Sequence, residues 1–313
     1  MYDTVHFYIR DGTTDFTQLN KYLKQVKLAY NECGIFKGCI GFIGKFRIQL
    51  GYGWMSCKGS LSKAYFGNNV QRMNLQQVKE IIETLSDILH YDVRTLNVTR
   101  LDIADNFAMS SPVAKYFQYL GTLARLKRVY IVEKETLKYG TGSSHSLVLY
   151  DKTKEIKSNS PHLLKKLEIP TNLLRYEARY SHRLASRFKR PIINGATLYD
   201  EAFFHKIIQS WYDSYSDIEK LSLIQLRGID KIKNVKDFLN YALNVALINQ
   251  PPAFVDDIIE KAKEQNIFRY PSEYTRAKNE LKKLRNNPLI ADSSELITEL
   301  NRKVRQTYDE MIG

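Results

Sequence analysis

The sequence has little cysteine and no long apolar run. Its three cysteines are Cys33, Cys39 and Cys57; none belongs to a CxxC pair with partner histidines, which argues against a zinc site. We expect buried, reduced thiols in a reducing compartment. No run approaches the roughly 18 apolar residues of a membrane span, and the N-terminus lacks the basic, apolar and small residues of a signal peptide in that order. We therefore predict a globular, cytoplasmic protein with no membrane partner.

Acidic residues are too few to balance the basic ones. The chain has 47 Lys and Arg against 34 Asp and Glu, which gives a formal net charge of +13. Residues 151–190 hold eleven Lys and Arg but four Asp and Glu, so a net charge of +7 lies within this one segment. Such a segment favours a polyanion partner, usually nucleic acid, although a merely solvated basic surface is the alternative.

The composition is that of a globular protein with both strands and helices. Hydrophobic residues make up 43% and charged residues 26% of the chain, which excludes a disordered or collagen-like protein. Apolar residues three or four apart predict a helix from Thr14 that includes Leu23, Val26 and Ala29, and a helix capped by Asn74. A further helix is predicted over 112–126, a strand meander over 35–66, and strands over 2–10, 96–107, 128–139, 145–155 and 172–182.

The order of these elements predicts an α+β fold with a central, mainly antiparallel sheet and helices packed on one of its faces. The short segment 139–143 favours a hairpin. From about residue 195 helical spacing predominates, and we predict a first domain over 1–200, which contains the sheet, and a helical C-terminal domain or extension over 201–313. The helices of the second part are expected over 198–211, 234–249, 253–265, 272–286 and 294–311.

Three predicted strands place charged side chains on one face. Because side chains alternate along a strand, one face carries Arg100, Asp102, Ala104 and Asn106, and another carries Arg175, Glu177 and Arg179. Val148, Tyr150, Lys152 and Lys154 share a face if their strand continues that far. Charged groups within a sheet are costly unless they are paired or bind a metal, so the pattern favours a site assembled across the sheet. A sheet with one solvated face is the alternative.

In this order the three segments resemble the replication initiators of filamentous phages and related plasmids, the gene II/gene X family. That family carries an Arg-x-Asp strand, a Leu-x-x-Tyr-x-Lys-x-x-Glu segment and an Arg-[Tyr/Phe]-Glu-Ala-Arg strand. The matching residues here are Arg100-Leu101-Asp102, Leu147 to Glu155 with Tyr150 and Lys152 in place, and Arg175-Tyr176-Glu177-Ala178-Arg179. The resemblance extends over about residues 1–200 and includes the opening Met1-Tyr2-Asp3.

The resemblance implies an enzyme that nicks and rejoins DNA in rolling-circle replication. Its tyrosine attacks a backbone phosphate at the origin, which leaves a 5′-phosphotyrosine and a free 3′-OH that primes synthesis. By position the nucleophile is Tyr150. Tyrosine has an ordinary pKa of about 10, and we expect the charges of Lys152 and Lys154 to favour loss of its proton.

Neither the sequence nor the gene II-like family carries the His-hydrophobe-His motif of better-known rolling-circle nickases, so carboxylates would hold the metal. Mg²⁺ or Mn²⁺ prefers oxygen ligands and can stabilise the charge that develops on the phosphate. Strand alternation favours Asp102 and Glu177 as ligands, with Glu155 as a third and Asp3 or Asn106 as weaker candidates.

The basic residues around these segments are expected to contact DNA. Arg100, Arg175 and Arg179 either grip phosphates or orient the carboxylates. The basic segment continues downstream, where the alternative is a solvated helix face, with Arg183, Arg187, Lys189 and Arg190.

The predicted partner is origin DNA, as duplex and single strand, in the cytoplasm of a bacterial host cell. Host helicase and polymerase are further candidate partners, and a dimer is left open. Two other functions also stay open at this point. One is a non-catalytic DNA-binding regulator of replication, and the other is a mobilisation relaxase with the same chemistry.

Overall fold

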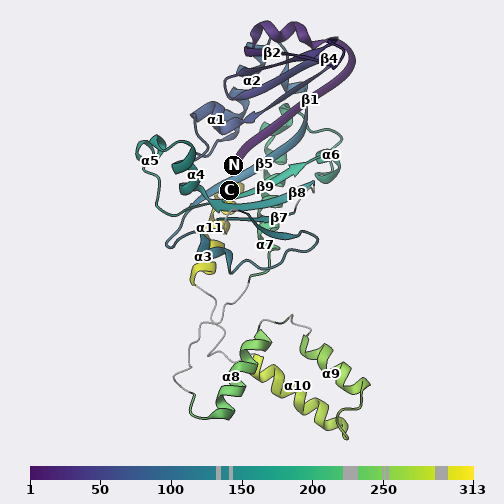
Figure 1. Cartoon of the computed structure of the whole chain (residues 1–313), viewed down its shortest axis with the longest axis vertical. Helices are drawn as coiled ribbons and strands as arrows, with labels where there is room; N and C mark the ends of the chain where they lie inside the picture. Colours follow the sequence, from purple (N-terminus) through teal and green to yellow (C-terminus); the bar gives the residue numbers. More distant parts are fainter. Residues whose placement is uncertain (132–134, 141–143, 221–231, 249, 251–253, 286–294) are drawn as a thin grey trace. The chain divides into compact units, whose positions relative to one another are not determined.

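The computed structural model describes residues 1–131, 135–140, 144–220, 232–248, 250, 254–285 and 295–313 (Figure 1). The chain divides into two compact units. The first consists of Met1–Ala114, Thr122–Ile218 and Leu300–Gly313, and the second of Lys115–Gly121 and Glu219–Glu299. The first unit thus extends beyond residue 200, where the sequence pattern placed the change, and it includes the end of the chain.

A nine-stranded sheet forms the first unit, with strand order β2-β3-β4-β1-β5-β9-β8-β7-β6. Every described pair of neighbouring strands is antiparallel. The predicted α+β class with a central antiparallel sheet is therefore confirmed. The strands are β1 (Tyr2–Asp15), β2 (Lys24–Tyr30), β3 (Phe36–Ile43), β4 (Phe46–Ser60), β5 (Asn97–Ala108), β6 (Arg128–Ile131), β7 (Thr136–Tyr139), β8 (His145–Asp151) and β9 (Leu173–Ser181).

Helices follow the strands and form the described part of the second unit. The first unit contains the 3-10 helices η1 (Phe16–Tyr22), η2 (Val93–Thr95) and η3 (Ala196–Tyr199), and the helices α1 (Leu61–Phe66), α2 (Leu75–Leu89), α4 (Lys152–Asn159), α5 (His162–Lys166), α6 (Leu184–Arg187) and α7 (Glu201–Ser216). The second contains α8 (Val235–Ile248), α9 (Phe254–Glu264) and α10 (Pro271–Arg285), whereas α3 (Ala114–Phe117) and α11 (Glu295–Ile312) contribute residues to both. No helix among the described residues is both long and apolar enough to cross a membrane.

The apolar face of the sheet packs against α7. Tyr176 of β9 is buried, its ring centroid lies 5.1 Å from that of Trp211, and its hydroxyl donates to the Trp211 carbonyl oxygen at 3.0 Å. Leu101 and Ile103 of β5 are buried as well. Because side chains alternate, the residues between them point to the opposite face, which is where the charged side chains gather.

Two helix predictions are wrong in part. The segment after Thr14 forms only η1, capped by Asp15, and then β2, where Val26 and Ala29 lie in a strand. In this segment apolar and polar residues such as Val26 and Lys27 also alternate, as in a strand. This pattern prevails over the helical spacing of the apolar residues, because β3 pairs with the segment. The helix expected over 112–126 is limited to Ala114–Phe117.

Several strand boundaries also differ from expectation. The predicted strand over 128–139 is two strands, β6 and β7, and α1 ends the predicted meander. β7 pairs with β8 as a hairpin requires, although residues 141–143 of the predicted turn lie outside the described part of the chain. Cys39 and Cys57 are buried as expected, but Cys33 is exposed.

Helix α2 begins with a capping interaction between Asn74 and Gln77. The Asn74 side chain accepts from the Gln77 backbone N–H at 2.8 Å, and the Gln77 side chain accepts from the Asn74 N–H at 3.0 Å. We expect Asn74→Ala to lower the free energy of unfolding of the first unit by about 1 kcal/mol, because the Gln77 backbone N–H loses its acceptor at the start of the helix. Urea denaturation followed by the fluorescence of Trp54 and Trp211 measures it. Gln76→Ala, on the exposed side of the same turn, is the control, and an equal loss in both variants would contradict the assignment.

Candidate active site

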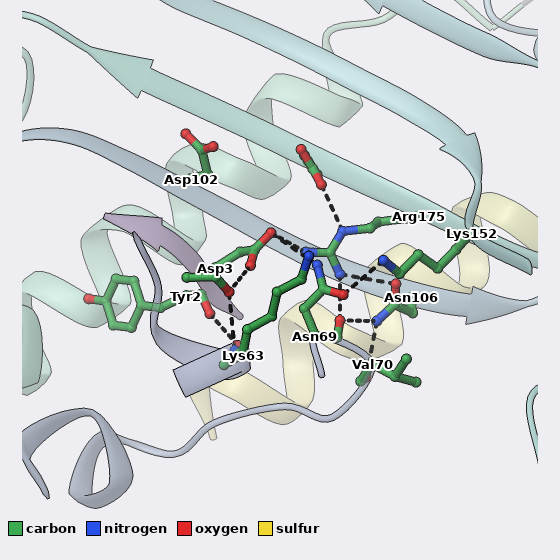
Figure 2. A network of polar contacts seen from close by, with 12 residues as sticks. Tyr2, Asp3, Lys63, Asn69, Val70, Asp102, Asn106, Lys152 and Arg175 are labelled. Carbon is green, nitrogen blue, oxygen red and sulfur yellow. Dashed lines mark hydrogen bonds and ion pairs between the residues drawn. The ribbon is translucent and has the colours of Figure 1, made fainter. Parts of the chain in front are cut away.

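A polar network occupies the face of the sheet opposite α7, across β1, β5, β9 and β8 (Figure 2). The register of the strands explains why these side chains meet. Asp102 lies opposite Arg179, Ala104 opposite Glu177, Asn106 opposite Arg175, and Arg175 in turn opposite Tyr150. Residues that are directly opposite in an antiparallel pair share a face, so alternation correctly predicted that the charged groups of β5 and β9 come together.

Arg175 is the centre of this network and is 2% exposed. Its guanidinium pairs with Asp3 at 2.6 Å and with Glu177 at 2.8 Å. It also donates to Asn106 Oδ1 at 3.1 Å and to the carbonyl oxygen of Asn69 at 2.9 Å. Ser60 donates to the other oxygen of Asp3 at 2.6 Å. The buried charges are therefore paired and hydrogen-bonded, which is the condition under which a sheet tolerates them.

Glu177 connects this centre to the predicted nucleophile. Its Oε1 accepts from the Tyr150 hydroxyl at 3.0 Å, and its Oε2 accepts from Arg179 at 2.7 and 3.0 Å. Burial opposes ionisation of Glu177, but Arg175 and Arg179 outweigh it and lower the pKa of this carboxyl. Burial and the neighbouring Glu177 charge raise the pKa of Tyr150 well above its ordinary value. Tyr150 is thus a neutral phenol hydrogen-bonded to a carboxylate.

The two lysines after Tyr150 lie on a helix rather than on the strand. β8 ends at Asp151, whose side chain accepts from the Lys154 N–H at 3.0 Å and caps α4. The prediction that Lys152 and Lys154 share the strand face of Tyr150 is therefore wrong. Lys152 is nevertheless buried, with its Nζ 6.0 Å from the Tyr150 ring centroid, and burial lowers its pKa. Lys154 turns to an exposed pair with Glu135.

The carboxylates predicted to bind a metal do not assemble into one site. Both oxygens of Asp102 accept from Arg100, at 2.6 and 2.9 Å, and burial raises the pKa of Asp102. Glu155 pairs with Lys152 at 2.6 Å. Among the residues that the structure describes, no group of three or more His, Cys, Asp or Glu side chains could hold a metal ion. The described arrangement thus does not fit a preformed Mg²⁺ or Mn²⁺ site, because guanidinium groups take up the oxygens such an ion needs.

The downstream basic residues surround a helix of one turn. α6 covers only Leu184–Arg187, so Arg183 and Lys189 lie outside it, and both are exposed. Arg187 lies over the Tyr180 ring at 5.0 Å, and Arg190 pairs with Asp200 at 2.6 Å. These contacts do not involve Tyr150.

One participant in the network was not predicted from the sequence. Asn69, in the loop between α1 and α2, accepts from Lys152 Nζ at 2.8 Å and provides the carbonyl oxygen for Arg175. It lies in no strand and no helix, so no periodicity marks it. Asp3 and Asn106, which alternation gave as weaker metal candidates, are instead partners of Arg175.

Comparison with known proteins identifies the family. The family model of the N-terminal region of the phage replication-associated protein, the gene II product, matches residues 1–207. The chain therefore belongs to this family, and the resemblance to gene II-type proteins is confirmed. One similar solved structure is a rolling circle replication initiator protein from Geobacillus stearothermophilus, with 11% identity, a TM-score of 0.38, and coverage of 78% of this chain and 95% of that one. No curated protein matches significantly.

Removal of Arg175 should destabilise the first unit strongly. Arg175→Met leaves Asp3 and Glu177 buried without their common partner, and we expect a loss of about 3–5 kcal/mol in the free energy of unfolding. Arg94→Met is the matched control, because Arg94 pairs with Asp92 at the exposed surface and should cost less than about 1 kcal/mol. Adding Asp3→Asn and Glu177→Gln should recover part of the loss. Equal stability of Arg175→Met and Arg94→Met in urea would contradict the role of Arg175.

Proposed function

We propose that this protein initiates rolling-circle replication of a phage or plasmid by nicking one strand of origin DNA through Tyr150. The observation that carries the proposal is the hydrogen bond of 3.0 Å from the Tyr150 hydroxyl to Glu177, within a network of arginines. Membership in the gene II replication-associated family supports it. The site of action would be the cytoplasm of a bacterial host.

In the proposed reaction Glu177 is the general base. The Tyr150 oxygen attacks the phosphorus, its proton passes to Glu177 Oε1, and the bond from phosphorus to the 3′ oxygen breaks. The 3′ oxygen takes a proton from water and becomes the free 3′-OH, while the 5′ phosphate stays on Tyr150. A host polymerase would extend that 3′-OH, with a host helicase as a further partner. Transfer of the phosphoryl group back to a 3′-OH rejoins the strand.

Arg179 would couple DNA binding to the transfer of the Tyr150 proton to Glu177. The side chain of Arg179 is 34% exposed, whereas that of Arg175 is 2% exposed. A scissile phosphate can therefore reach Arg179 and compete with Glu177 for it. Loss of that cation makes Glu177 a stronger base, and the guanidinium stabilises charge on the phosphate.

A divalent metal is a separate part of the proposal. Asp102 and Glu177 offer the oxygen ligands that Mg²⁺ or Mn²⁺ prefers, and metal binding there requires Arg100 and Arg179 to release them. Parallel reactions with Mg²⁺, Mn²⁺ and a chelator test the requirement.

Replacement of the nucleophile should abolish covalent attachment. With supercoiled plasmid that carries the cognate origin, Tyr150→Phe should form 5′-linked protein–DNA adduct at least about 10³-fold more slowly than the wild type. Tyr52→Phe, which removes a phenol that is 69% exposed, should react as the wild type does. Equal nicking by Tyr150→Phe would remove Tyr150 from this role. Origin binding without any cleavage by the wild type would favour a non-catalytic regulator instead.

Replacement of the base should change how cleavage depends on pH. Because the pKa of Glu177 is lowered below its usual 4.5, the wild-type rate should not fall until the pH drops below that value. Glu177→Gln should be about 10²–10⁴-fold slower at neutral pH, and its rate should rise with pH as hydroxide replaces the carboxylate.

Glu83→Gln is the control for this measurement, since Glu83 lies on α2 and pairs with Lys79 at the exposed surface. It should leave the shape of the pH profile unchanged. Rescue of Glu177→Gln by raised Mn²⁺, with no change in the pH profile, would assign Glu177 to a metal rather than to proton transfer.

A further inference from the structure

A row of side chains crosses four strands beside the polar network. Lys58 of β4 lies opposite His6 of β1, His6 opposite Arg100 of β5, and Arg100 opposite Ser181 of β9. These residues line a hollow of about 610 Å³, which also includes Arg47. Among the described residues, no Asp or Glu contributes to its lining. A hollow with three cations and no carboxylate in its wall attracts an anion.

Two of the three cations are available to a ligand. Arg100 is held by Asp102, but within the described part of the chain neither Arg47 nor Lys58 forms an ion pair, and both are exposed. The fold of β4 brings them to the same hollow. A Cβ at Gly59 would lie 2.5 Å from the Phe46 ring, so only glycine permits this approach of the two ends of the strand.

His6 forms part of the wall and carries no charge at neutral pH. Its Nε2 lies 2.7 Å from Ser56 Oγ and its Nδ1 lies 3.1 Å from Thr99 Oγ1. Burial, together with Lys58 and Arg100, lowers the pKa of the ring. Both ring nitrogens have partners, so the attraction for an anion comes from the Lys and Arg side chains.

We propose that this hollow binds single-stranded DNA a few nucleotides away from the scissile phosphate. Arg100 lies four positions before Ala104 on β5, or about 13 Å along the strand, and Ala104 lies opposite Glu177. Arg47 and Lys58 would contact phosphates. Tyr8 and His182, also in the lining, offer rings for bases to stack on, which an intact duplex does not allow. This inference depends on the proposed function in one respect, namely that the single strand bound in the hollow is the strand that Tyr150 cuts.

The test is binding of fluorescein-labelled oligo(dT) by the full chain, measured by anisotropy over a range of salt. Arg47→Ala/Lys58→Ala should bind at least about tenfold more weakly, and the slope of log affinity against log salt should fall by about 1.4, or 0.7 for each lost phosphate contact. Lys79→Ala/Lys206→Ala, which removes two charges on α2 and α7 outside the hollow, should bind as the wild type does.

The outcomes separate this inference from the nicking mechanism. Tyr150→Phe should bind oligo(dT) normally, and Arg47→Ala/Lys58→Ala should still form the covalent adduct at saturating DNA. Unchanged affinity and salt slope in the Arg47→Ala/Lys58→Ala variant would overturn the inference, and so would a loss confined to duplex DNA. If Tyr150→Phe still nicks DNA while Arg47→Ala/Lys58→Ala loses oligo(dT) binding, the proposed DNA-binding role of the hollow is supported and the role of Tyr150 as nucleophile is contradicted. Unaltered Trp fluorescence would verify that the exposed substitutions leave the fold intact.

Discussion

The guanidinium of Arg175 is buried between the carboxylates of Asp3 and Glu177, and the candidate active site depends on this contact. A charge removed from water in this way is tolerated only with partners at hydrogen-bond distance. The two carboxylates belong to β1 and β9, which do not pair with each other and are separated in the sheet by β5. Arg175 thus fixes the position of Glu177, and through it the direction of the Tyr150 hydroxyl.

The acidic and basic side chains of the network nearly balance each other. The network therefore differs from the surrounding surface, which carries exposed basic side chains. Asp3, Glu177 and Asp102 each have an arginine partner. Little positive charge is left over there to attract a nucleic acid from solution. In our proposal this attraction comes from exposed cations outside the network, Arg47 and Lys58 of β4. The proposed chemistry and the proposed attraction of DNA thus belong to different residues.

Strand alternation was sufficient to predict much of this site, because the period of two is a property of the backbone that tertiary structure does not change. It placed Arg100 with Asp102 and Glu177 with Arg179, and the three matched motifs predicted the family. The position of Lys152 was missed because Asp151 caps a helix directly after Tyr150, and an Asp at that point is itself a helix-start signal. Asn69 had no signal at all, since it acts from a loop.

Several of the residues that Arg175 contacts lie far from it in sequence, which determines when the network can form during translation. Asp3 and Arg175 are 172 residues apart in sequence, and Asn69 is 106 residues from Arg175. Contacts of such range form late, because distant segments must first be brought together. A nascent chain that has not yet emerged from the ribosome as far as β9 lacks both Arg175 and Glu177. Translation products that end before β9 therefore cannot build the network.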